Sequence, residues 1–354
     1  MLRAGCAFVK RRRLVAYEIG ADDLGGRGSE RGKRLTVPTP NRKINLCLLE
    51  LVQEWCLTEQ LPVYGGQALL EGVLMRGRHT MAIAVRAPAG DIQLQTERLG
   101  ALYQSRWMQV PFVRGVLGLW DSLSLGMRGL NYSARVANGE PGDLQRASDW
   151  GSLVMGIGFA LSLFFLLPAG LSSLVELWVP LGSWWANLLE GVMRLAILIS
   201  YMLLVGLVPE IARVFAYHGA EHKTINAFEA GAELVPERVA EFSLLHPRCG
   251  TAFLLILVVF SVLVFSLIGQ QPLLVRLATR IAFIPVLAGL AYELLRFGAR
   301  NFGNPLVRAL AAPGLAMQRL TTREPDAEML AVAIAAFECM RAGEKTATAQ
   351  AGVG

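Results

Sequence analysis

Long apolar stretches separated by charged segments occupy the middle of the chain. Residues 150–175 and 249–275 contain no charged side chain, and a helix that crosses a membrane needs about 20 apolar residues. Both stretches therefore predict transmembrane helices. Residues 184–209 and 281–295 predict two more, although each of them contains charged residues. The hydrophobic pattern indicates a mainly α membrane protein with about four transmembrane helices.

A second kind of pattern precedes the apolar stretches. Residues 80–86 and 91–97 have the composition of short strands around a proline- and glycine-containing turn, and residues 65–77 are punctuated by glycine. Together they predict a small β-rich cytoplasmic unit. Residues 107–137 are apolar but carry a charged side chain every few positions. That pattern is typical of an amphipathic helix at a membrane surface or packed on other helices.

The tail after the last apolar stretch predicts one more helix. Thr322 is followed by acidic residues and then by apolar residues at helical spacing over 329–340, which is a helix-start signature leading into an amphipathic helix. Residues from Gly343 onward are expected to be frayed.

These patterns divide the chain into five expected parts. They are a basic, disordered leader with a short helix (1–60), the β-rich unit (61–105), an amphipathic helical region (106–148), a four-helix membrane domain with a cytoplasmic loop at 209–249 (149–302), and a cytoplasmic tail with an amphipathic helix (303–354).

Composition and charge support the membrane interpretation. The chain has 354 residues, of which 53% are hydrophobic and 18% charged, with a mean hydropathy of +0.43. Soluble domains are less apolar and more charged. The net charge of +6 is spread around the apolar segments, which argues against nucleic-acid binding. Lysine and arginine are absent from residues 172–187 but frequent ahead of the first span and over 213–248, so both termini are expected to be cytoplasmic.

Cysteine usage excludes one class of protein. The five cysteines are scattered and form no C-x-x-C pair, which argues against a disulfide framework.

Two of the four histidines form the strongest chemical motif in the chain. His218, Glu221 and His222 match the H-x-x-E-H order of inverted zinc peptidases, in which the histidines bind zinc and the glutamate is the general base. On a helix, imidazoles four residues apart share one face and can bind one divalent metal ion, with zinc the first candidate. The alternative is a solvated helix end with ordinary histidines.

Further metal ligands are expected on the same side of the membrane. His246 and Cys249 are good zinc ligands and lie just before a span, as the first pair lies just after one. Packing of the two helices would bring the clusters together. Glu293 is a candidate acidic ligand, because a carboxylate near the end of a membrane helix needs a partner, which could instead be Arg296 or Arg300.

A glutamate in the glycine-rich segment could also reach the site. Glu71 lies beside Arg76 between glycines, and the competing interpretation of this pair is a tight turn with a surface ion pair.

Several of these motifs occur together in one known family. The segments 65–77, 114–115, 130–134, 217–223 and 246–251 resemble, in this order, those of the YqhQ-like family of bacterial membrane proteins. The resemblance covers about residues 62–340. It implies a multi-pass protein of the bacterial inner membrane, in a family of unknown function often labelled as predicted metal-dependent enzymes, and it supplies no substrate.

Three functions compete at this point, and whether the protein is an enzyme stays open. The first is a metal-dependent hydrolase at the cytoplasmic face, with His218 and His222 as ligands and Glu221 as the base. The second is a membrane scaffold or assembly factor with a structural metal site. The third is a small-solute carrier that uses Glu190 and Glu293.

Overall fold

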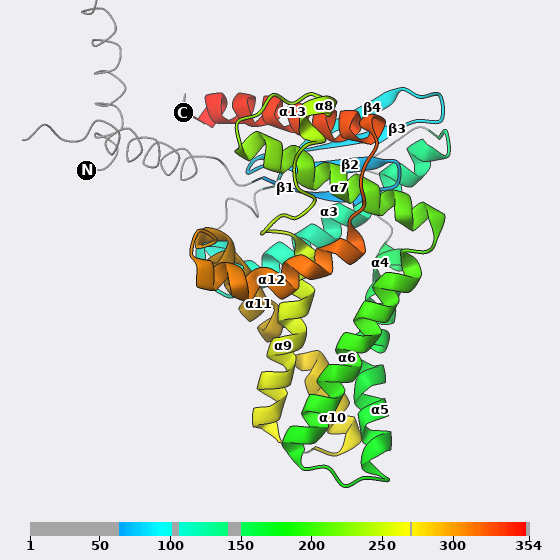
Figure 1. Ribbon diagram of the computed structural model, residues 1–354, viewed down its shortest axis with the longest axis vertical. Helices are drawn as coiled ribbons and strands as arrows, with labels where there is room; N and C mark the ends of the chain where they lie inside the picture. The colour runs from blue at the N-terminus through cyan, green and yellow to red at the C-terminus, as the bar shows by residue number, and fades with distance from the viewer. Residues whose placement is uncertain (1–63, 101–105, 141–149, 270, 352–354) are drawn as a thin grey trace, which may run out of the picture. The chain divides into compact units, whose positions relative to one another are not determined.

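A meander of four strands lies at one end of the folded chain. The computed structural model describes residues 64–100, 106–140, 150–269 and 271–351 (Figure 1). The predicted leader, 1–60, lies outside the described residues. The strands are β1 (Gly65–Leu69), β2 (Gly72–Arg76), β3 (Thr80–Arg86) and β4 (Ile92–Arg98), paired antiparallel in that order. The two strands predicted from the sequence are confirmed as β3 and β4.

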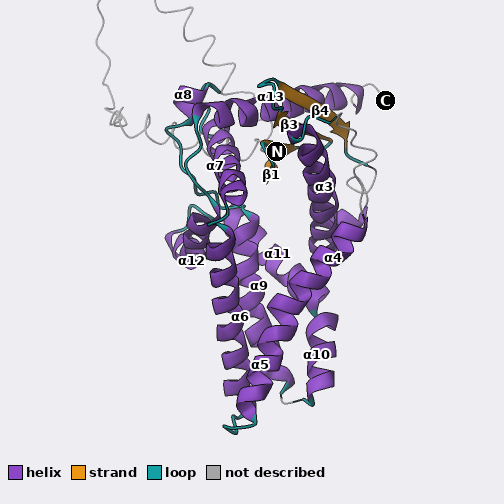
Figure 2. Cartoon of the chain, turned by 90° about the vertical axis from the view of Figure 1, so that its right-hand side faces the viewer, coloured by secondary structure: helices purple, strands orange, loops and turns teal. Residues whose placement is uncertain are grey.

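Helices cover both faces of this sheet. Helices α7 (Pro209–Glu229) and α13 (Ala327–Ala351) lie on one face, and α3 (Val113–Ala137) lies on the other (Figure 2). Side chains of β2 and β3 alternate between the two cores, since Val73 and Met75 pack with α7 and α13 whereas Leu74 packs with α3. Burial on both faces explains why β3 has an almost continuous apolar sequence.

The predicted tail helix is confirmed, but its expected end is wrong. Helix α13 continues past Gly343 to Ala351, because the carboxylate of Glu344 accepts hydrogen bonds from the β2–β3 turn. The backbone N–H groups of His79 and Thr80 donate to Glu344 Oε1 at 2.5 and 2.7 Å. The hydroxyl of Thr80 donates to the same oxygen at 2.9 Å.

The apolar stretches form helices of membrane-spanning length. Three described helical segments are long and apolar enough to cross a membrane: Leu153–Glu176, Trp184–Val205 and Gly250–Ile268. The first comprises α4 (Trp150–Leu161), the π-helical turn η3 (Ser162–Leu166) and α5 (Leu167–Glu176), and the other two belong to α6 (Ser183–Val205) and α9 (Gly250–Ile268).

The fourth predicted span is a broken helix. Helices α10 (Leu273–Ala282) and α11 (Ile284–Arg300) meet at an angle of 44° and count as a span only if taken together. The break falls beside Pro285, which cannot donate a helix hydrogen bond. The chain is completed by the short helices η2 (Arg106–Gln109) and α8 (Pro236–Val239), and by α12 (Pro305–Thr321).

The two charged residues of α6, Glu190 and Arg194, are both paired. Pro168 lacks an N–H group, so the carbonyl of Phe164 has no partner four residues later, and Arg194 donates to it at 2.8 Å. Arg194 also pairs with Glu190 one helical turn away, at 2.6 Å. Arg276 and Arg280 of α10 donate to the same carboxylate. The buried Glu190 therefore joins α6 to α10.

Candidate metal centre

Helix α7 carries the H-x-x-E-H motif in its buried half. His218 and His222 lie one turn apart with ring centroids separated by 4.4 Å. Ala220, between them, is fully buried in the core below the sheet. A Cβ atom on Gly219 would lie 2.1 Å from the carbonyl oxygen of Arg323, so only glycine allows the connection between α12 and α13 to approach the histidines this closely.

Backbone carbonyls set the tautomer of both rings. His218 Nδ1 lies 2.8 Å from the carbonyl oxygen of Thr321, and His222 Nδ1 lies 2.5 Å from that of Leu244. A carbonyl oxygen can only accept, so each Nδ1 carries the proton and each Nε2 keeps its lone pair. Metal-binding histidines are usually held in this way, with the second ring nitrogen donating to a carbonyl or carboxylate.

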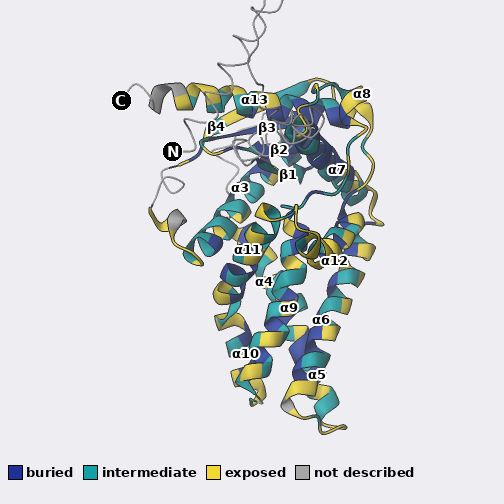
Figure 3. Ribbon diagram, turned by 60° about the vertical axis from the view of Figure 1, so that its left-hand side comes forward, coloured by how far each residue is buried: buried dark blue, intermediate teal, exposed yellow. Residues whose placement is uncertain are grey.

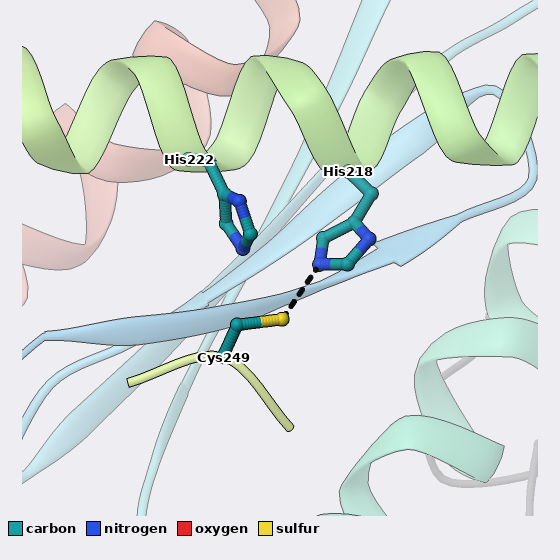
Figure 4. A group of neighbouring side chains, drawn as sticks. All are labelled: His218, His222 and Cys249. Carbon is teal, nitrogen blue, oxygen red and sulfur yellow. Dashed lines mark hydrogen bonds between the residues drawn. The ribbon is translucent and has the colours of Figure 1, made fainter. Parts of the chain in front are cut away.

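Cys249 brings a third ligand atom to the histidines. It is the N-cap residue of α9, and its Sγ lies 3.4 Å from His218 Nε2 (Figure 4). One ligand atom from each of His218, His222 and Cys249 lies within 4.8 Å of the others. Nitrogen and sulfur ligands of a tetrahedral zinc ion lie about 3.5 Å apart. The three side chains are therefore close enough that they could hold a divalent metal.

Glu221 points from the same helix turn toward the sheet. Its side chain is buried, and the N–H of Gly66 in the edge strand β1 donates to its carboxylate. Burial raises the pKa of Glu221, while the nearby His218 and His246 favour its charged form. A bound cation would favour ionised Glu221 further.

His246 lies close to the cluster without joining it. Its ring centroid is 5.7 Å from that of His222, and its Nε2 is 3.8 Å from a carboxylate oxygen of Glu229. Burial lowers the pKa of His246, which favours the neutral ring. Among the described residues, the group of ligand atoms contains Cys249 and not His246.

Sequence reasoning missed two residues of α12. The side-chain amide of Gln318 accepts from His246 N at 2.9 Å and donates to His246 O at 2.8 Å, so it fixes the backbone just before Cys249. Thr321 supplies the carbonyl that orients His218. Gln318 is fully buried, which is unusual for a glutamine, but its burial cannot be read from the sequence, where it stands beside Arg319.

The two other candidate carboxylates lie in separate ion pairs. Glu293 accepts from Arg114 at 2.7 and 2.5 Å and contributes no atom to the ligand group of the described residues. Glu71 accepts from Nε and Nη2 of Arg213 and from the hydroxyl of Tyr217, and this bonding lowers its pKa. The ion-pair interpretation of Glu71 is confirmed, with Arg213 in place of Arg76.

Comparisons with known proteins identify the family but no activity. Residues 110–342 match the family model described as "Protein of unknown function (DUF1385)". The chain is 32% identical to the "Uncharacterized protein YqhQ" of Bacillus subtilis (strain 168) over 292 residues, which cover 78% of this chain and 91% of that protein. No solved structure matches. Because the family model covers more than half of the sequence, including every residue of the candidate metal centre, the chain belongs to the DUF1385 family of proteins of unknown function.

Proposed function

We propose that this protein is a metal-dependent hydrolase embedded in a membrane, with its reactive centre at the cytoplasmic face. The observation that carries the proposal is the convergence of three ligand atoms, from His218, His222 and Cys249, beside the buried carboxylate of Glu221. Catalytic zinc sites typically have three protein ligands and one open position, whereas structural sites are closed by four.

Each residue has a defined task in this proposal. A divalent metal such as zinc would supply Lewis-acid chemistry and make water a stronger acid. The carbonyls of Thr321 and Leu244 keep Nε2 of each histidine available as a ligand. Glu221 accepts a proton from the attacking water and returns it to the leaving group, which is general acid–base catalysis.

The membrane part of the proposal is supported by exposed apolar side chains. Leu267 of α9, Leu274 of α10 and Trp178 after α5 are 88%, 80% and 84% exposed, and exposed residues recur along the spans (Figure 3). A soluble protein rarely exposes so much contiguous apolar surface. Insertion in a bilayer would cover it. The arginine and lysine distribution supports the part of the proposal in which the metal centre and both termini lie on the cytoplasmic side of a bacterial inner membrane.

Metal analysis of the detergent-purified protein tests the proposed centre. The wild type should carry about one zinc or similar ion per chain, and His218→Ala, His222→Ala and Cys249→Ser should each lose most of it, because each removes one of three ligands. His79→Ala is the matched control, since His79 lies in the β2–β3 turn, and it should retain the metal. A wild type without metal, with unaltered function of the ligand variants in cells, would refute the proposal.

A structural metal site is the second candidate, because the ligands come from different parts of the chain. A metal bound there would tie α7 to the start of α9. Glu221→Gln separates the two: it should keep the metal in both cases but abolish cellular complementation only if the protein is a hydrolase. Full complementation by this variant would favour the structural site and a scaffold function.

The carrier hypothesis receives less support. Glu190 is bonded to three arginines and Glu293 to Arg114. A transported ion or solute would have to displace these bonds.

A further inference from the structure

Helix α12 has two halves with different surroundings. In its C-terminal half, Gly314, Met317, Gln318 and Thr321 are buried. Its N-terminal half, from residue 305 to 313, has no buried residue. Leu306 and Leu310 in this half are 68% and 74% exposed.

The helix crosses the ends of two candidate spans. A Cβ atom on Gly314 would lie 2.9 Å from the Cβ of Ala252, which belongs to the first turn of α9. Met317 packs with Leu198 and Met202 from the second half of α6. The helix therefore lies level with the C-terminal end of α6 and the N-terminal end of α9 (Figure 1).

One apolar stripe runs along both halves. With about 3.6 residues per turn, Leu306, Leu310 and Met317 fall within a narrow arc on one side of the helix. At the C-terminal end, Met317 rests on apolar side chains of the spans. At the N-terminal end, the two leucines are largely exposed. Because this half of the helix lies level with the ends of the candidate spans, lipid can cover these leucines as the spans cover Met317.

The opposite side of α12 is basic. Arg308 and Arg319 lie there, both are exposed, and neither forms an ion pair with a carboxylate of the described residues. From Arg296 to Arg323 the sequence contains arginine but no aspartate or glutamate. A helix with leucines on one side and uncompensated arginines on the other is suited to the headgroup layer of an anionic membrane.

We propose that α12 binds anionic phospholipid at the membrane surface and thereby positions the candidate metal centre. Leu306 and Leu310 contact the acyl chains, and Arg308 and Arg319 pair with lipid phosphate. The same helix holds the backbone of His246 through Gln318 and orients His218 through Thr321. The lipid contact rests on the proposed membrane insertion but not on the proposed hydrolase chemistry.

Hydrogen exchange of the full-length protein in lipid nanodiscs tests this contact. Discs of phosphatidylcholine alone are compared with discs of phosphatidylcholine and phosphatidylglycerol in equal parts. Amides of α12 should exchange more slowly in the anionic discs, by on the order of fivefold for each arginine that contacts a headgroup. The amides of α13, which lies against the sheet, should exchange equally in both.

Exposed-residue variants keep the test specific. Arg308→Gln combined with Arg319→Gln should abolish the difference between the two kinds of disc. Arg78→Gln removes an exposed arginine from the β2–β3 turn and should preserve the difference. Leu306→Ser combined with Leu310→Ser should speed the exchange of α12 in both discs, because the acyl contact is lost regardless of headgroup charge.

Two negative outcomes of the nanodisc experiment lead to different conclusions. A protein that inserts into the discs but exchanges equally in both lipids would overturn the α12 proposal and leave membrane insertion standing. A protein that is recovered outside the discs in detergent-free buffer would overturn the membrane part of the proposed function, and the lipid contact with it.

Discussion

Glycine residues decide how closely the backbone approaches the candidate metal centre. A Cβ atom on Gly66 would lie 2.9 Å from the Cδ of Glu221, and one on Gly219 would overlap the carbonyl of Arg323. At both positions a side chain would overlap neighbouring atoms, so glycine is required for steric reasons and not for a turn conformation. The sequence H-G-A-E-H consequently contains two kinds of residue: side chains that bind, and small residues that let neighbouring backbone reach them.

Gly219→Ala should disturb the centre without altering a ligand. The added methyl group must displace the connection between α12 and α13, which is backbone and cannot rotate away, at a cost of about 1–3 kcal/mol. We expect a lower melting temperature in detergent and weaker retention of metal. Gly298→Ala in α11 is the control, because a Cβ there meets no atom within 4 Å. Equal stability of the two variants would contradict this account of Gly219.

Helix α13 stabilises the sheet through both its apolar face and one carboxylate. Glu344→Ala leaves the N–H groups of His79 and Thr80 without their acceptor at a partly buried turn, which should cost about 1–3 kcal/mol. Glu338→Ala in the same helix changes an exposed carboxylate and should have little effect. Thermal unfolding of both variants measures the difference, and an unchanged midpoint for Glu344→Ala would contradict the proposed role of this contact.

Elements with a strong local pattern could be predicted from the sequence, and those defined by distant contacts could not. The apolar spans, β3, β4 and the amphipathic start of α13 follow from periodicity over neighbouring residues. The extension of α13 depends on Glu344 and Thr80, which are 264 residues apart. The contact of Gln318 with His246 spans 72 residues. Such bonds leave no periodic trace, so the role of α12 could be recognised only in the folded chain.

At the scale of the whole molecule, the sequence motifs indicated which residues form the candidate centre. They indicated less well how the helices that carry these residues are arranged. Packing of α6 on α9 was the expected reason for His218 and Cys249 to meet, and these helices do share a core. The histidines, however, lie on the separate helix α7, and α12 joins the parts. At the other end of these apolar helices, the buried charges around Glu190 join α6 to α10.

The charge cluster around Glu190 should control the stability of the spans. Glu190 is 2% exposed and pairs with Arg194, Arg276 and Arg280, while Glu176 pairs with Arg276. Removing one partner of a buried ion pair leaves an uncompensated charge and typically costs about 3–5 kcal/mol. Glu190→Gln should therefore lower the melting temperature in detergent strongly, as followed by loss of the monodisperse peak in size-exclusion chromatography after heating.

A compensating variant separates charge balance from simple loss of hydrogen bonds. Combining Glu190→Gln with Arg280→Gln removes one charge of each sign and should recover part of the lost stability, because fewer arginines remain without a carboxylate. Glu210→Gln, at an exposed position in the first turn of α7, controls for loss of a carboxylate outside the cluster. If the double variant is less stable than Glu190→Gln alone, the cluster acts through its hydrogen-bond geometry and not through charge balance. If Glu190→Gln is as stable as the wild type, the packing of apolar side chains is sufficient to hold α6 and α10 together.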